Sequence, residues 1–255
     1  MLHSDLSGDL KRLRLPAMAD NLELRAREAE EGKLGYLEFT SLLVQDELAS
    51  RESNSFQKRL KAAGVASRMT FEFFDYDFNA AVLSPQVVRD LATCRFIEQH
   101  RNLVLAGPPG IGKSHLAQAI GHEAARRGLD VIVFKTHKLL EKLAPDRLSA
   151  KRSQLLVKRC IDAGLLILDD FAFRPYSQLE TELLYTLSDE RLTEGSIIVT
   201  SNRPPEDWFA VFPDPIVGGA IMDRLVSGAV KLIVTSGRSY RKEGGRQNEP
   251  HAISA

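Results

Sequence analysis

The pattern of apolar and polar residues divides the chain into a helical first part and a second part in which helices and strands alternate. In residues 5–68, apolar residues recur at helical spacing among charged ones, with breaks at Pro16, Gly32 and Gly35. From about residue 84, short β-branched apolar runs are separated by segments of helical spacing. Strands that alternate with helices predict a parallel sheet covered on both faces.

The apolar runs predict five strands, at residues 102–106, 131–134, 164–168, 196–200 and 230–234. Ser84 and Pro85 should begin a helix over residues 86–99, because serine caps helices and proline suits the first helical position. The aromatic run 71–78 has no clean period, and we expect it to pack against the second part.

These patterns predict four regions along the chain. They are an all-helical N-terminal domain for partner or DNA contact at 1–69, a linker at 70–84, an α/β domain at 85–241 and a disordered tail at 242–255.

Composition and charge narrow the class of protein. The 255 residues include 34 basic and 34 acidic side chains, so a globally basic nucleic-acid binder is not indicated, although local patches remain open. Cys94 and Cys160 lack the spacing of a zinc site or a disulfide framework. We find neither a secretory signal nor the run of about twenty apolar residues that a membrane helix needs. We therefore expect a cytoplasmic protein without membrane contact.

The strongest chemical signal is the run Gly-Pro-Pro-Gly-Ile-Gly-Lys-Ser between a predicted strand and a predicted helix. It matches the phosphate-loop pattern G-x-x-x-x-G-K-[ST]. Glycines let several backbone N–H groups point at one phosphate, and the helix N-terminus adds partial positive charge. Lys113 should reach the β- and γ-phosphates and Ser114 should bind Mg²⁺. The predicted nucleotide-binding residues are Gly107, Pro108, Pro109, Gly110, Ile111, Gly112, Lys113, Ser114 and His115.

Two later strands end in polar residues that should reach the same sheet edge. Asp169 and Asp170 follow strand 164–168; Asp169 would hold Mg²⁺ through its waters, and Asp170 would orient or deprotonate the attacking water. Asn202 follows strand 196–200 and either touches the γ-phosphate or its water, or caps the next turn.

Two arginines late in the chain have the chemistry to stabilise phosphoryl charge. Arg224 lies in a predicted helix and Arg241 follows in Gly-Arg-Ser-Tyr-Arg. Guanidinium groups suit phosphoryl oxygens. An exposed arginine on a solvated helix is the alternative for either residue.

Taken together, these segments resemble the IstB/DnaC-like branch of the AAA+ ATPases, and within it the IstB-type ATP-binding proteins of insertion sequences. The resemblance is carried by the phosphate loop and by Leu-Lys-Arg-Leu-Arg-Leu-Pro, Thr-Ser-Asn, Glu-Asp-Trp, Asp-Arg-Leu and Gly-x-Ser-Tyr-Arg, in the family's order. It implies an α/β fold, in which an AAA+ P-loop core with a parallel sheet between helices follows a small all-helical domain.

The resemblance also implies roles for single residues. Lys113 and Ser114 resemble the Walker A pair, and Asp169 and Asp170 the Walker B pair. Asn202 takes the sensor-one position. Arg224 takes the place of an arginine finger that acts on a neighbouring subunit's nucleotide, and Arg241 takes the sensor-two position. Asp170 departs from the frequent glutamate, and its shorter side chain would hold a water differently, which predicts slow hydrolysis. Ile111 stands where threonine is frequent.

The function implied is that of a bacterial transposition helper that uses ATP and Mg²⁺. It would self-associate on duplex DNA and engage a partner transposase of the IstA type, with slow hydrolysis stimulated by assembly. One alternative is a replicative helicase loader of the DnaC/DnaI type, although the zinc cluster of some loaders is lacking. A P-loop small-molecule kinase and an ATP-gated scaffold with negligible turnover are the others.

Two basic stretches are candidates for DNA contact, and a solvated helix face is the alternative for each. Contacts of this kind go to phosphates and depend on salt. The candidate residues are Lys138, Lys142, Lys151 and Arg152 in the first stretch, and Lys58, Arg59 and Lys61 in the second.

Overall fold

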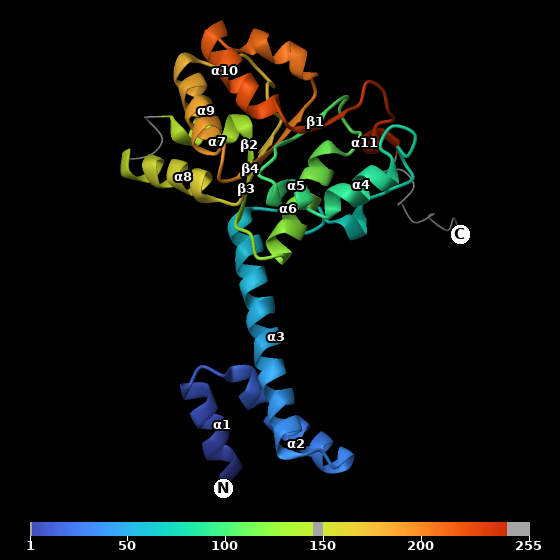
Figure 1. The fold of residues 1–255 in the computed structure, drawn as a ribbon, viewed down its shortest axis with the longest axis vertical. Coiled ribbons are helices and arrows are strands. Elements are labelled where there is room, and N and C mark those ends of the chain that lie inside the picture. Colours follow the sequence, from blue (N-terminus) through green and yellow to red (C-terminus); the bar gives the residue numbers. More distant parts are fainter. Residues whose placement is uncertain (1, 145–149, 244–255) are drawn as a thin grey trace, which may run out of the picture. The chain divides into compact units, whose positions relative to one another are not determined.

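The computed structural model describes residues 2–144 and 150–243 (Figure 1). Most of the tail predicted at 242–255 lies outside the described residues. The chain forms two compact units that divide between Lys58 and Arg59. This division precedes the boundary expected at residue 69 and falls inside helix α3 (Tyr36–Ala63).

The last turns of α3 belong to the second unit for a physical reason. The Arg59 guanidinium donates a hydrogen bond of 2.9 Å to the carbonyl oxygen of Ala125. The Arg159 guanidinium donates one of 2.7 Å to the carbonyl oxygen of Ala62. These bonds tie the end of α3 to the helices around the sheet.

The first unit consists of α1 (Leu2–Arg12), α2 (Pro16–Gly32) and most of α3. Proline begins α2, and Lys33 ends it in a left-handed conformation with φ of 50°. Glu47 of α3 is buried and accepts the N–H groups of Ala17 and Met18 at the start of α2. This carboxylate therefore satisfies donors that the first turn of a helix leaves free.

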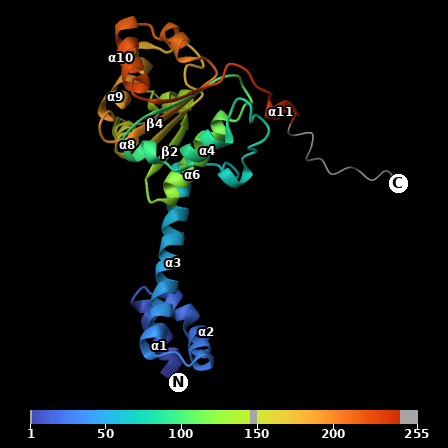
Figure 2. The ribbon, with the colours of Figure 1, turned by 45° about the vertical axis from the view of Figure 1, so that its right-hand side comes forward.

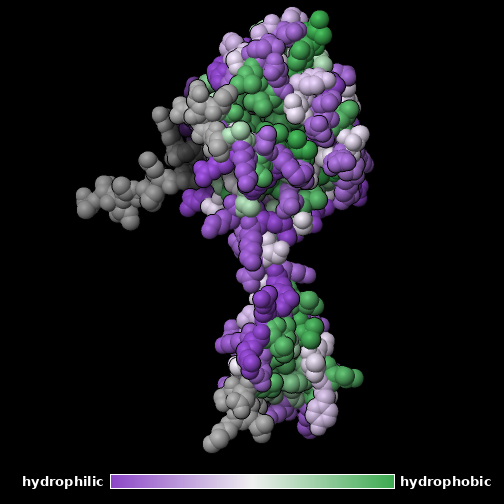
Figure 3. Space-filling model, turned by 90° about the vertical axis from the view of Figure 1, so that its left-hand side faces the viewer, coloured by the Kyte–Doolittle hydropathy of each residue, from purple (hydrophilic) through white to green (hydrophobic). Residues whose placement is uncertain are grey.

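The first unit also keeps apolar side chains on its surface. Figure 3 shows that they gather on one face of these helices. The exposed apolar residues of α2, α3 and the turn between them are Leu24, Leu34, Tyr36, Leu37, Val44 and Leu48, which we call the apolar face.

The second unit is built on a five-stranded parallel sheet in the order β2-β3-β4-β1-β5. The strands are β1 (Leu103–Ala106), β2 (Val131–Lys135), β3 (Leu165–Asp169), β4 (Ser196–Ser201) and β5 (Val230–Ile233). All five predicted strands are present. Lys135 lies opposite Asp169 in the register, and Ala106 lies opposite Ser201, so these strands end at one edge.

Helices cover both faces of the sheet (Figures 1 and 2). On one face lies α6 (Lys113–Arg126), where a Cβ on Gly121 would come within 2.8 Å of Ile167 Cδ1. The other face carries α7 (Thr136–Leu143), α8 (Ala150–Asp162), α9 (Gln178–Glu190) and α10 (Pro215–Val226). The core between these helices and the sheet also buries Trp208 of the 3₁₀ helix η2 (Pro205–Val211).

One buried cation is part of this core. Arg191, which follows α9, is 2% exposed, and burial lowers its pKa to about 10. Its guanidinium donates to the carbonyl oxygens of Cys160, Ile161, Ala163 and Ser196. Because three of these carbonyls lie at the end of α8, Arg191 closes that helix in the way cations favour helix C-termini.

The helix predicted at 86–99 is instead two short helices, α4 (Pro85–Ala92) and α5 (Arg95–Glu98). Cys94 separates them in a left-handed conformation with φ of 56°. In one straight helix Ile97 would point about 180° away from Val88. The break allows both side chains to be buried.

Candidate nucleotide-binding site

The phosphate loop joins β1 to α6, and its backbone requires glycine. Gly107, Gly110 and Gly112 have φ of 150°, 87° and 106°. A Cβ on Gly107 would collide with the carbonyl oxygen of Val234, and one on Gly110 would collide with Ser239 Oγ. Glycine therefore lets the loop adopt these conformations and pack closely against residues 234 and 239, as a backbone cradle for phosphate requires.

Lys113 lies at the centre of this cradle. Its Nζ donates to the carbonyl oxygens of Gly107 (2.7 Å) and Pro108 (2.8 Å) and to Asn202 Oδ1 (2.9 Å). Burial lowers the pKa of Lys113 to about 8, while the nearby carboxylates of Asp170 and Asp169 oppose this shift. An ammonium group held among neutral oxygen atoms is prepared to bind the oxygens of an anionic ligand.

Asp169 gathers hydroxyl groups from three elements. Its Oδ1 accepts from Ser114 Oγ at 2.7 Å and from Thr200 Oγ1, and its main-chain oxygen accepts from Thr136 Oγ1 at 3.0 Å. Asp169 is buried. Mg²⁺ prefers oxygen ligands and is usually held by one or two protein oxygens with substrate phosphates. The Ser114 and Asp169 oxygens, placed beside the phosphate loop, fit such an ion.

Asp170 is held in a definite place by Thr200 and Lys135, to which the sequence patterns assigned no role at this site. Its backbone is left-handed, with φ of 55°, and its N–H donates to Thr200 Oγ1 at 3.1 Å. Its Oδ2 accepts from Lys135 Nζ at 2.8 Å, and this bond raises the pKa of Lys135. Thr200 and Lys135 each lie at the carboxyl end of a strand, which is the signal that could have pointed to them.

The aromatic run 71–78 forms one wall of a cavity above the phosphate loop. It includes the 3₁₀ turn η1 (Phe71–Phe73). Phe74 makes edge contacts with Tyr76 and His115, each at 5.3 Å between ring centroids. Apolar and aromatic walls suit a flat nucleobase. The residues of this wall are Met69, Phe73, Phe74, Tyr76, Phe78 and Leu83.

The two arginines singled out from the sequence occupy different places. Arg241, in α11 (Tyr240–Glu243), lines the cavity together with Lys113, Asp170 and Asn202. Arg224 of α10 does not line it. The Arg224 guanidinium donates to Asp189 Oδ1 at 2.7 Å and lies 4.7 Å from the centre of the Tyr185 ring, both on α9. Except for Arg224, the predicted catalytic and metal residues therefore come together in one chain.

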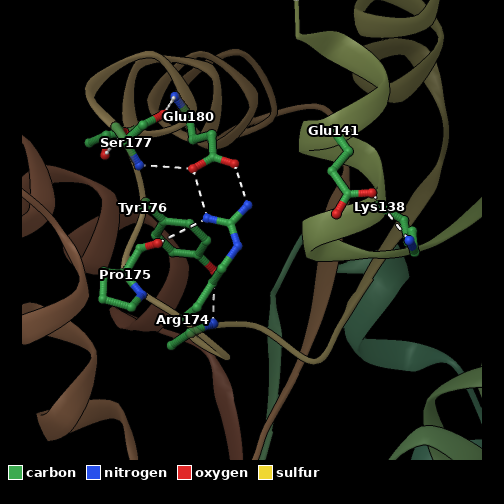
Figure 4. A network of polar contacts seen from close by, with 9 residues as sticks. Lys138, Glu141, Arg174, Pro175, Tyr176, Ser177 and Glu180 are labelled. Atoms are coloured by element: carbon green, nitrogen blue, oxygen red, sulfur yellow. Dashed lines mark hydrogen bonds and ion pairs between the residues drawn. The ribbon is translucent and has the colours of Figure 1, made fainter. Parts of the chain in front are cut away.

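The loop after Asp170 is fixed by a polar network (Figure 4). Arg174 forms two hydrogen bonds with the Glu180 carboxylate, at 2.7 and 3.0 Å. Glu180 also accepts the N–H of Ser177, whose hydroxyl accepts the N–H of Glu180 in return, a capping box that begins α9. The start of α9 is thereby tied to the loop that carries Asp170.

The basic residues considered for DNA contact lie on three helices. Lys138 pairs with Glu141 of α7 at 3.2 Å, and Lys142 lies 5.1 Å from the centre of the Phe134 ring. Arg59 is used in the fold, as described above. The remaining candidates have exposed side chains: Lys151 and Arg152 on α8, and Lys58 and Lys61 on α3.

Two further observations bear on the class of protein. None of the helices in the described part of the chain combines the length and apolar character needed to cross a membrane. Within residues 2–144 and 150–243, no cluster of three histidine, cysteine or acidic residues offers a metal site, and Cys94 and Cys160 are buried free thiols.

Comparison with known proteins places nearly the whole chain in one family. The family model of IstB-like ATP-binding proteins matches residues 8–248. An insertion-sequence ATP-binding protein of Mycobacterium tuberculosis is 39% identical, over 94% of this chain and 96% of its own length. The ATP-binding protein of the insertion sequence IS21 from Pseudomonas aeruginosa is 34% identical, over 93% and 89%.

Solved structures show the same fold. The DnaC helicase loader has a TM-score of 0.56 at 20% identity, covering 67% of this chain and all of the loader. AMPPCP-bound DnaA from Aquifex aeolicus has a TM-score of 0.56 at 22% identity, covering 72% of this chain and 55% of DnaA. The sheet, the phosphate loop and the flanking helices therefore have the AAA+ P-loop fold.

Proposed function

The chain belongs to the family of IstB-like ATP-binding proteins, and from this premise we propose that it is an ATPase that assembles on duplex DNA as the helper of a partner transposase. The observation that carries the ATPase part of the proposal is the Ser114–Asp169 hydrogen bond of 2.7 Å beside the Lys113 ammonium. It joins the phosphate loop to the strand end that carries Asp170, so binding and hydrolysis groups converge on one place.

Each residue has a task in this mechanism. Ser114 and Asp169 would hold Mg²⁺, which neutralises phosphate charge when bound. Lys113 binds phosphate oxygens in place of the loop carbonyls. Asp170 orients the attacking water and accepts its proton at Oδ1, because Lys135 occupies Oδ2. Asn202 and Arg241 border the cavity where the terminal phosphate would lie.

Arg224 is proposed to act on the nucleotide of a neighbouring subunit. It does not line the cavity of its own chain. Its Nη2 lies 2.6 Å from Asp189 Oδ1, which holds the guanidinium in place. An arginine supplied from outside stabilises charge in the transition state, so hydrolysis depends on assembly. The Asp189 pair keeps Arg224 oriented until a neighbour binds.

DNA contact is proposed for the exposed basic side chains of α7 and α8. Lys151 and Arg152 open α8, and Lys138 and Lys142 lie on α7, which directly follows Lys135. Phosphate contacts of this kind give affinity without sequence preference. Lys138, the nearer of the two proposed contacts on α7, lies three residues after the cation that holds Asp170.

The apolar face of the first unit is proposed as the surface for the transposase. Tyr36 is 93% and Leu37 is 87% exposed there, although both are large apolar side chains. Apolar groups gathered on one face commonly mark contacts between proteins. The likeness to helicase loaders rests on fold alone, so we do not propose a loader function.

Imaging of the protein with duplex DNA, once with ATP and once with ADP, tests this function. We expect ordered assemblies on DNA with ATP and their loss with ADP. A Ser114→Ala variant, which lacks the hydroxyl on Asp169, should behave with ATP as the wild type does with ADP. Assemblies that are equal with both nucleotides would contradict the proposal.

A further inference from the structure

The side-chain amide of Asn79 joins two segments that are far apart in the sequence. Its Nδ2 donates to the main-chain oxygen of Arg238 at 3.1 Å, and its Oδ1 accepts the Arg238 N–H at 3.0 Å. Asn79 is 8% exposed, so both bonds are shielded from bulk water. The amide thereby pairs with the backbone as a neighbouring strand would.

Other contacts strengthen the same junction. The Arg238 guanidinium donates to the carbonyl oxygen of Phe78 at 2.6 Å and lies 4.5 Å from the centre of the Phe78 ring. That ring meets Tyr240 edge-on at 5.0 Å between centroids. A Cβ on Gly237 would come within 2.9 Å of Ile111 Cγ2, so the chain passes close to the phosphate loop.

The segment held by Asn79 carries Arg241 to the cavity. The Tyr240 N–H donates to the carbonyl oxygen of Gly110 at 2.9 Å, and Arg241 follows it. Arg241 borders the cavity with Lys113 and Asp170. Asn79 also borders the cavity, but its amide nitrogen and oxygen are both engaged with Arg238.

We propose that Asn79 is a positioning residue that sets the place of Arg241 against the terminal phosphate, so that the segments around residues 79 and 238 close on the nucleotide together. The inference rests on the proposed function, in which Arg241 faces that phosphate. Without the Asn79 amide, Arg241 loses its fixed place. ADP lacks the phosphate concerned, so ADP binding depends less on Asn79 than ATP binding does.

A double-mutant cycle tests this inference, with dissociation constants for ATP and ADP measured on the full chain. We expect Asn79→Ala to weaken ATP binding about tenfold, because Arg241 is then no longer held against the terminal phosphate. ADP binding should weaken less than about threefold. In an Arg241→Ala background, Asn79→Ala should change ATP binding less than about twofold, because coupled residues are not additive. Gln86→Ala, an exposed amide on α4, is the matched control.

The cycle separates this inference from the proposed function. If Asn79→Ala weakens ATP binding equally in the wild-type and Arg241→Ala backgrounds, the positioning role is overturned. The proposed function is not affected by that result. A wild-type chain that hydrolyses no ATP on DNA would instead contradict the proposed function. If Asn79→Ala does not fold, Asn79→Ser is neutral and keeps a hydroxyl that can replace one of the two bonds to Arg238. Its smaller loss should likewise vanish in the Arg241→Ala background, and a loss that persists there overturns the inference.

Discussion

The Lys135 ammonium lies 2.8 Å from the Asp170 carboxylate and occupies one of its two oxygens. The pair is partly open to water, with 55% of the Lys135 side chain exposed. It joins the residue that precedes α7 to the group proposed to accept the proton of the attacking water. Lys135 therefore restrains this proposed proton acceptor in the isolated chain.

Replacing Lys135 by methionine should raise hydrolysis without DNA by roughly threefold to tenfold, because both Asp170 oxygens can then hold water. DNA should stimulate this variant less than it stimulates the wild type. Initial rates with and without duplex DNA measure both effects. Lys11→Met removes a comparably exposed pair with Asp20, away from α7 and α8, and should change neither rate. A basal rate that falls in Lys135→Met would show that the pair supports hydrolysis.

The phosphate loop should not tolerate a methyl group at its first glycine. In Gly107→Ala the Cβ collides with the carbonyl oxygen of Val234, and ATP affinity should fall roughly a hundredfold or more. Gly219 of α10 has no atom within 4 Å of a Cβ, so Gly219→Ala should keep ATP affinity and gain up to about 1 kcal/mol of stability. Calorimetric titration and urea unfolding measure the two quantities. Normal affinity in Gly107→Ala would refute the cradle.

ATP binding should take up a proton in weakly alkaline solution. Burial lowers the pKa of Lys113 to about 8, so above that pH most of the free protein holds a neutral amine. A bound polyphosphate favours the charged form and raises this pKa again. At pH 8.5 binding should take up roughly 0.7 of a proton and weaken as pH rises further.

Titration calorimetry in buffers of different ionisation enthalpy measures that uptake. Lys113→Arg is the matched control, since arginine stays charged over this range. Its binding, though weaker, should take up almost no proton. Equal uptake by the wild type and Lys113→Arg would assign the proton to another group.

Charge reversal on α8 should change the salt dependence of DNA binding. In Lys151→Glu/Arg152→Glu, the slope of log affinity against log salt should become shallower by roughly two or more per subunit. Arg89→Glu/Lys231→Glu reverses two exposed charges elsewhere in the second unit and should leave the slope unchanged. Fluorescence anisotropy on duplex DNA between low and moderate salt measures it. An unaltered slope in the α8 variant would remove α8 from the DNA surface.

The sequence predicted the local features of the site and missed its long-range ones. The five strands and the phosphate loop follow from short patterns, because strand burial and glycine geometry are local properties. The Asn79–Arg238 pair joins positions 159 residues apart, which no local period encodes. The break at Cys94 was missed for a related reason. Burial of both Val88 and Ile97 requires the helix to break between them, and this tertiary requirement overrides the helical tendency of residues 86–99.

The composite site is tested most directly by mixing two inactive variants. Arg224→Ala keeps its own pocket but offers no arginine to its neighbour. Asp170→Asn cannot activate water but still presents Arg224. Each alone should hydrolyse ATP at least tenfold more slowly than the wild type on duplex DNA. If Arg224 acts between subunits, an equal mixture should recover about a quarter of wild-type turnover, as random neighbours predict. A mixture no more active than its two components, although both assemble on DNA, would contradict the account.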